Sequence, residues 1–152
     1  MCDPAYAKVL VESFERLTGR TLGDPWTLAQ PLVSHGTEPD PIFRYANPAA
    51  LALWEMNWDS FIKLPSRHSA QDDPAIQTDR STYLAQAAAK GWVSDYQGIR
   101  ISATGRRFAI SQTILWTVTD LSGRHHGQAA LIGRVERLDE GRFAPVLWEQ
   151  PR

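Results

Sequence analysis

The sequence predicts an α+β fold: a five-stranded antiparallel sheet, with helices inserted between strands two and three and a further helix at the N-terminus. Two observations predict it. Up to residue 90 the apolar residues recur mainly at helical spacing, apart from two short strand-like segments, whereas from residue 92 they alternate with polar residues in three long segments. Consecutive alternating segments joined by short turns are typical of an antiparallel meander. The length of 152 residues suits a single domain.

The expected helix starts are marked by an Asp or Asn that precedes a proline. Asp and Asn are favoured N-caps, and proline is tolerated at the first helical position. Such pairs stand at residues 3–4, 24–25, 47–48 and 73–74, and they predict helices over residues 4–18, 26–28, 48–56 and 75–90. Arg80 falls on the apolar face of the last of these helices.

The strands are predicted from apolar runs bounded by turn residues and from period-two alternation. They cover residues 31–36, 42–46, 92–102, 108–118 and 128–137. The predicted apolar face of the fourth strand carries Phe108, Ile110, Ile114 and Trp116. The opposite face carries mostly small and polar residues beside Leu115, a composition that suits a covering helix or a partner. We expect the N-terminal helix to pack there or across a dimer interface.

Gln112 lies on the otherwise apolar face of the fourth strand. A buried amide needs hydrogen-bond partners. Gln112 is therefore predicted either to orient a ligand or to be satisfied by nearby backbone groups or by Arg80.

Composition and charge exclude several classes of protein. The chain has 16 basic and 17 acidic residues, and this balance argues against a dedicated nucleic-acid-binding protein. It has no apolar run of membrane-spanning length and no basic and apolar leader at its start. Its one cysteine, Cys2, excludes an internal disulfide and a four-thiolate zinc site. A cytoplasmic location is expected.

The order of two strands, several short helices and three strands is similar to that of a PAS domain, and specific words of the sequence narrow the resemblance. These words are Ser34-His35, Asp40-Pro41-Ile42-Phe43, Tyr45-Ala46-Asn47, Pro65-Ser66-Arg67, Ser69-Ala70, Asp95-Tyr96, Gly98-Ile99-Arg100-Ile101-Ser102, Gly105, Arg107-Phe108 and Gly127-Gln128-Ala129-Ala130. They resemble the MEKHLA domain, a PAS-like family of small stand-alone bacterial proteins that also forms the C-terminal domain of plant homeodomain–leucine-zipper transcription factors. The resemblance covers residues 5–137 and implies a sensing or interaction module.

The chain is accordingly divided into an N-terminal helical extension (1–30), a PAS-like MEKHLA domain (31–137) and a C-terminal tail (138–152) that has no clear period. In such a fold the natural cavity lies between the sheet and the helices. The candidate ligand-binding residues are Gln112, Tyr96, Trp116, Arg80, Arg67, Arg100, Trp54 and Phe108. Convergent guanidinium groups would suit a carboxylate or a phosphate.

Each of these candidates also has a structural interpretation. The three arginines could instead form internal salt bridges with Asp59, Asp72 or Asp95, and the aromatic rings could simply fill the core. On the third predicted strand, simple alternation places Arg100 on the face opposite Ile99, so only a bulge near Gly98 would let both contribute to the core.

No cofactor can be named from the sequence. The four histidines have no metal-site spacing, so no metal is predicted. Haem-binding PAS domains usually take an axial histidine from the long helix before the sheet, and residues 75–90 contain none. Flavin-binding photosensors of this class use a cysteine in the inserted helices, and Cys2 is the wrong place for a covalent adduct.

Three hypotheses about function follow. The first is a sensory module that binds a small molecule between the sheet and the helices, in a pocket of about 300 Å³ or more, and acts through a homodimer or a protein partner in signalling or transcription regulation. The second is a ligand-free dimerisation or protein-interaction domain, with a filled core and an apolar patch on the outer sheet face. The third is a small enzyme, with a strongly perturbed histidine or carboxylate in a cleft.

Overall fold

A central antiparallel sheet organises the computed structural model, which describes residues 3–138 and 146–147. Its strands are β1 (Leu32–His35), β2 (Phe43–Ala46), β3 (Trp92–Ile101), β4 (Arg107–Thr119), β5 (His125–Leu131), β6 (Arg134–Arg137) and β7 (Val146–Leu147). They lie in the order β2-β1-β5-β4, and β3 pairs with the other edge of β4. The fifth predicted strand is split into β5 and β6, both of which pair with β4. The expected order of helices and strands is therefore confirmed.

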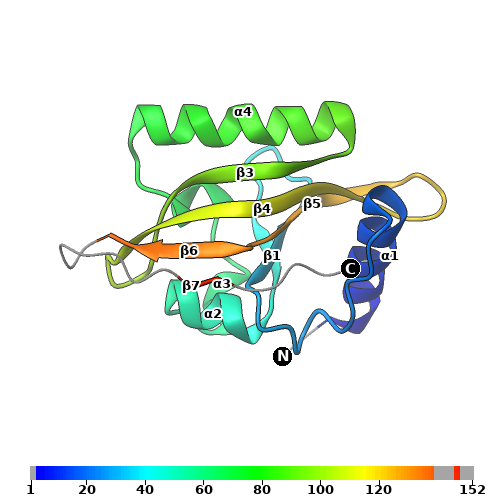
Figure 1. Cartoon of the computed structure of the whole chain (residues 1–152), viewed down its shortest axis with the longest axis horizontal. Helices are drawn as coiled ribbons and strands as arrows, with labels where there is room; N and C mark the ends of the chain where they lie inside the picture. Colours follow the sequence, from blue (N-terminus) through cyan, green and yellow to red (C-terminus); the bar gives the residue numbers. More distant parts are fainter. Residues whose placement is uncertain (1–2, 139–145, 148–152) are drawn as a thin grey trace.

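The helices cover both faces of this sheet (Figure 1). They are α1 (Pro4–Thr18), α2 (Pro48–Trp54), α3 (Trp58–Phe61), the 3₁₀ helix η1 (Ser66–Ser69) and α4 (Pro74–Lys90). We call the face that packs on α2, α3 and α4 the inner face, and the face that packs on α1 the outer face. Among the described residues, no helix combines the length and the apolar character needed to cross a bilayer.

The helix starts follow the predicted capping signals. The side chains of Asp3, Asn47 and Asp73 accept hydrogen bonds from backbone N–H groups of the first turns of α1, α2 and α4. The segment after Asp24 is a correction: it forms only a turn, not the helix expected over residues 26–28. In the predicted tail, the two residues of β7 add a short strand beside β6, and the remainder beyond residue 138 lies outside the described residues.

Asn47 does more than cap a helix. Its side chain is fully buried, and its Oδ1 accepts from the N–H groups of Ala50 and Leu32 at 3.1 and 3.0 Å. Its Nδ2 donates to the carbonyl oxygens of Pro25 and Gln30 at 3.0 and 2.8 Å. One amide thus fastens the segment before β1 to the start of α2 and satisfies four backbone groups that would otherwise be buried without partners.

A bulge in β4 reverses the expected orientation of half of that strand. Gln112 has a positive φ of 50°, and the strand changes its partner from β6 to β5 on either side of it. One extra residue shifts the period-two alternation by one position. Phe108 and Ile110 consequently face the inner core, whereas Ile114 and Trp116 face outward.

This reversal corrects the predicted outer face. The N-terminal helix does cover it, but α1 packs against Ile114, Trp116 and Val118 rather than against the small and polar residues expected there. The indole of Trp116 is fully buried, stands edge-on to the ring of Phe14 with centroids 4.9 Å apart, and donates to Ser13 Oγ at 3.1 Å. The α1 helix is therefore an integral layer of the fold.

Candidate functional site

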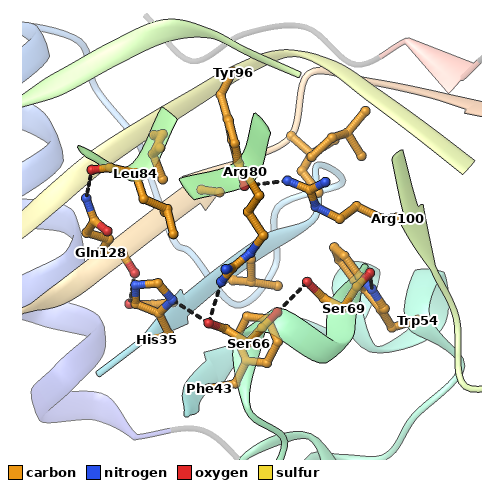
Figure 2. Close-up of a pocket in the computed structure, with 16 residues that line it drawn as sticks. His35, Phe43, Trp54, Ser66, Ser69, Arg80, Leu84, Tyr96, Arg100 and Gln128 are labelled. Atoms are coloured by element: carbon orange, nitrogen blue, oxygen red, sulfur yellow. Dashed lines mark hydrogen bonds between the residues drawn. The ribbon is translucent and has the colours of Figure 1, made fainter. Parts of the chain in front are cut away.

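A small cavity lies between the inner face of the sheet and the helices, where the sequence predicts a ligand site. Its volume is about 40 Å³, so the pocket of about 300 Å³ or more that the first hypothesis predicted is wrong. Apolar side chains from β1, β2, β4 and β5 form part of its wall. The polar side chains around it are those of His35, Ser66, Ser69, Arg80, Tyr96, Arg100 and Gln128 (Figure 2). The site is thus a polar enclosure within an otherwise apolar core.

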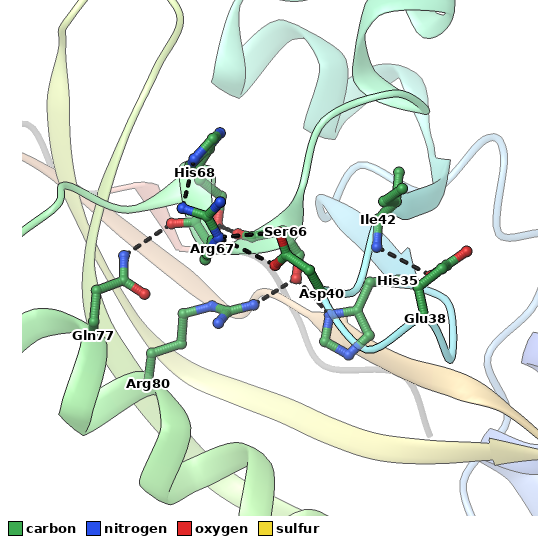
Figure 3. Close-up of polar contacts among 10 residues, drawn as sticks. His35, Glu38, Asp40, Ile42, Ser66, Arg67, His68, Gln77 and Arg80 are labelled. Atoms are coloured by element: carbon green, nitrogen blue, oxygen red, sulfur yellow. Dashed lines mark hydrogen bonds and ion pairs between the residues drawn. The ribbon is translucent and has the colours of Figure 1, made fainter.

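Ser66 is the hub of the polar contacts. Its hydroxyl is 1% exposed, accepts a hydrogen bond from Arg80 Nη2 at 2.6 Å and lies 2.8 Å from His35 Nδ1. The three side chains come from η1, α4 and the end of β1 (Figure 3). This hydroxyl therefore joins the inserted helices to the first strand, across the cavity.

One bulge in β3 and the bulge in β4 shift the pairing of these two strands on either side of Tyr96, and Tyr96 and Arg100 lie on the same wall. The pairing of β3 with β4 shifts between Val93 and Tyr96 and again between Tyr96 and Gly98. Arg100 Nη2 then donates to the Tyr96 hydroxyl at 2.5 Å, and Nη1 donates to the carbonyl oxygen of Ile99 at 2.8 Å. A bulge in β3 is present, but its extra residue lies between Val93 and Tyr96 rather than near Gly98.

Gly98 leaves room for the Arg100 guanidinium. A Cβ atom at Gly98 would lie 2.8 Å from Arg100 Nη1, closer than a carbon–nitrogen contact allows. A side chain at residue 98 would therefore require the Arg100 guanidinium to shift from its position beside the cavity.

Four of the eight candidate residues meet at this cavity: Trp54, Arg80, Tyr96 and Arg100. The Trp54 indole N–H donates to the carbonyl oxygen of Ser69 at 3.3 Å, and Ser69 Oγ donates to the carbonyl oxygen of Ser66 at 2.7 Å. Phe108 is fully buried on the same face and stands edge-on to Trp54, with centroids 5.3 Å apart, but it does not line the cavity.

The other three candidates lie elsewhere. Arg67 points away from the cavity and pairs with Asp40 at 3.1 Å, both side chains being half-exposed, so the predicted convergence of three arginines is wrong (Figure 3). The bulge in β4 explains the other two corrections. Gln112, at the bulge, is exposed instead of buried, and Trp116, beyond it, faces α1.

Sequence reasoning missed four polar residues of the site: His35, Ser66, Ser69 and Gln128. Each stands inside one of the words that carry the family resemblance. Gln128 Nε2 donates to the carbonyl oxygen of Leu84 at 2.9 Å, which ties β5 to α4 beside the cavity. The sequence offered one signal for these residues: each is a polar residue within such a word, on a predicted strand or beside a predicted loop.

His35 is uncharged at neutral pH. Its pKa is lowered to about 4, chiefly because burial would strip the imidazolium of its hydration and also because the nearby Arg80 repels it. A hydrogen bond with Gln128 and the charge of Glu38 act in the opposite direction, and His125 also lowers the pKa. Against an ordinary value near 6.5, the folded protein therefore resists protonation of His35.

We expect this resistance to make the protein less stable as the pH falls. Between pH 6.5 and 4 the unfolded chain binds a proton at His35 that the folded chain does not, so the free energy of unfolding should drop by about 3 kcal/mol over this window. His35→Gln should flatten that part of the profile in urea unfolding from pH 4 to 7.5. His125→Gln, at an exposed position, should keep the wild-type slope. Equal slopes for wild type and His35→Gln would contradict the assignment.

Comparison with known proteins narrows the identity of the chain. The sequence model of the MEKHLA domain matches residues 5–136, which is most of the chain. The protein belongs to the MEKHLA domain family. No curated protein gives a significant match. Within the described residues, no group of three His, Cys, Asp or Glu side chains is arranged to hold a metal ion.

Solved structures similar to this MEKHLA protein are PAS and light-oxygen-voltage domains. The PAS domain of a protein from Colwellia psychrerythraea is 11% identical, with a TM-score of 0.59, and the match covers 71% of this chain and 87% of that one. The light-state dimer of the fungal photoreceptor Vivid is 14% identical, with a TM-score of 0.61 and coverage of 82% and 90%.

An RNA-binding light-oxygen-voltage receptor is 21% identical, with a TM-score of 0.58; the match covers 71% of this chain but only 30% of the receptor. These likenesses establish a PAS-like fold, as the sequence predicted.

Proposed function

We propose that this MEKHLA protein is a PAS-like sensory module that binds a small molecule in the cavity between sheet and helices, and that it acts through a homodimer or a protein partner. The observation that carries the proposal is the buried polar enclosure formed by His35, Ser66, Arg80, Tyr96 and Arg100. Burial of polar groups destabilises a protein unless the groups are hydrogen-bonded, and an apolar core avoids this cost. Recognition of a bound ligand would explain why polar groups are present here.

The ligand differs from those of the light-sensing neighbours. One similar structure is a light-oxygen-voltage domain with a flavin analogue. Pockets for ligands of that size measure about 300–1,000 Å³. The cavity here has about 40 Å³, and Trp54, Arg80 and Arg100 occupy its surroundings, so neither a flavin nor a haem fits the residues present. The module is therefore proposed to sense a much smaller molecule or a small group of a larger one.

A molecule bound in the cavity would contact the long helix α4 directly. Arg80 enters the cavity from α4, and the hydrogen bond from Gln128 holds the same helix to β5 at Leu84. A molecule that engages Arg80 would compete with its contact to Ser66. A change in the cavity could thus shift α4 relative to the sheet, which offers a route to a partner surface or a dimer.

The ligand-free alternative expects a filled core, which a cavity of only about 40 Å³ supports, and an apolar patch on the outer sheet face. The α1 helix covers that face, and Leu121, in the loop between β4 and β5, is the one large apolar side chain that is exposed among the described residues. The enzyme hypothesis expects a perturbed histidine, and His35 is one. Its neighbour Ser66, however, is buried and already accepts from Arg80, which leaves its oxygen poorly placed to attack a substrate.

Native mass spectrometry of freshly purified protein tests the proposal, with the denatured mass of the same sample as the control. We expect extra mass that disappears on denaturation, together with a count of the subunits. A bare polypeptide mass in every charge state, from protein purified without exchange into ligand-free buffer, would favour the interaction module instead.

A further inference from the structure

Two buried guanidinium groups share the cavity, and no carboxylate among the described residues neutralises them. Arg80 is 8% exposed and Arg100 is 2% exposed. Neither forms an ion pair with any Asp or Glu in the part of the chain that the structure describes. Buried cations are normally paired with an anion, so a negatively charged group from outside the described residues is expected to balance this charge.

The hydrogen-bond donors of the two arginines are only partly used. A guanidinium has five N–H donors. Within residues 3–138, Arg80 donates to Ser66, and Arg100 donates to Tyr96 and to the carbonyl oxygen of Ile99. These acceptors are all uncharged. The remaining donors leave capacity for an acceptor inside the cavity, and both side chains line it.

The other charged groups nearby do not supply the missing negative charge. Asp40 attracts Arg80 from a distance, but it is half-exposed and already engaged by Arg67 at 3.1 Å. His35 is neutral at pH 7, since its pKa is about 4. Burial lowers the pKa of Arg80, and Arg100 and Arg67 also lower it, whereas Tyr96 and Asp40 raise it. The enclosure is therefore positive.

We propose that the cavity binds a small carboxylate, held between Arg80 and Arg100. This inference builds on the proposed function, because it names the chemical class of the ligand. The planar fork of a guanidinium matches the two oxygens of a carboxylate. A cavity of about 40 Å³ holds roughly three water-sized groups, which suits the three or four heavy atoms of formate or acetate better than a phosphate.

Thermal unfolding in sodium formate or sodium acetate, against sodium chloride at the same ionic strength, measures this binding. A carboxylate that binds only the folded state should raise the midpoint with the logarithm of its concentration above Kd, by about 5–10 °C at a hundredfold excess over its Kd. Chloride should not. Equal midpoints in carboxylate and chloride would overturn the proposal and would assign the cavity to water.

Three substitutions by methionine locate the effect. Arg80→Met and Arg100→Met should each abolish the carboxylate response, and neither should lower the midpoint in chloride much, because each removes a buried charge that lacks a partner. Arg67→Met is the matched control: it removes an exposed cation from the neighbouring loop and should keep the full response. A full response in Arg80→Met would overturn the assignment.

Gly98→Ala provides a test that keeps both charges. The new Cβ would displace the Arg100 guanidinium without removing it, so the apparent affinity for acetate should fall about tenfold or more if the position of Arg100 matters. This variant decides the question even where a methionine variant fails to fold. Unchanged affinity would exclude Arg100 from the site.

The same data separate the two proposals. A neutral molecule found by native mass spectrometry, with no response to formate or acetate, would leave the sensory module in place and refute the carboxylate. A bare polypeptide mass together with no carboxylate response would refute both.

Discussion

Gly127→Ala should destabilise the protein by about 4 kcal/mol or more. Gly127 has a φ of 138°, which L side chains rarely adopt. A Cβ atom there would lie 1.8 Å from the carbonyl oxygen of His35 and 2.9 Å from its carbonyl carbon. Both are backbone atoms of β1, so the clash cannot be relieved by turning a side chain. Strands β1 and β5 would have to separate, beside the wall of the cavity.

Urea unfolding of Gly127→Ala against Gly123→Ala tests this explanation. Gly123 also has a positive φ, of 86°, but a Cβ there meets no heavy atom within 4 Å. Gly123→Ala should therefore show only the cost of backbone strain, about 1 kcal/mol. Equal losses in the two variants would mean that the close approach of β1 to β5 is not what requires glycine at 127.

Most of the helices and the sequence of strands along the chain could be predicted because their signals are local. Asp3, Asn47 and Asp73 cap helices through hydrogen bonds within four residues, and a capping pattern needs nothing from the rest of the chain. The turn after Asp24 shows the limit of this reasoning. There the cap pattern is the same, yet the backbone groups that follow are used by Asn47, far along the sequence.

The bulge at Gln112 could not be predicted from alternation. Ile114, Leu115 and Trp116 are three consecutive apolar residues, so the sequence allows either one continuous apolar face along β4 or two half-faces with opposite orientation. Packing of β4 against α1 and its pairing with β6 favour the two half-faces with opposite orientation. The left-handed conformation of Gln112 therefore explains why neither Gln112 nor Trp116 lies in the predicted site.

The candidate site was predictable where a charged residue broke an apolar pattern. Arg80 stands on the apolar face of a helix, and this contradiction marked it correctly. Arg67 gave no such signal, since a polar loop tolerates an exposed cation. His35 and Ser66 were not predicted to line the site, because they meet through a contact between segments about 30 residues apart, which periodicity does not report.

Trp116→Ala should lower the free energy of unfolding by about 4 kcal/mol, since it removes a fully buried indole from between the sheet and α1. Trp116→Phe should lose less, about 1–2 kcal/mol, because a ring remains against Phe14 and mainly the hydrogen bond to Ser13 is lost. Urea unfolding measures both. A loss below 1 kcal/mol for Trp116→Ala would contradict the placement of α1 over this residue.

The tryptophan variants also distinguish the two faces of the sheet functionally. Trp54 lines the cavity and donates to Ser69, whereas Trp116 lies under α1 on the opposite face. Trp54→Phe should therefore weaken the stabilisation by acetate, while Trp116→Phe, a matched change in the same sheet layer, should keep it. The reverse result would restore Trp116 to the ligand site and would require β4 to run without the bulge at Gln112. The ligand site and the register of β4 would then both have to be revised, because the one-residue bulge at Gln112 determines which side chains of β4 face the cavity.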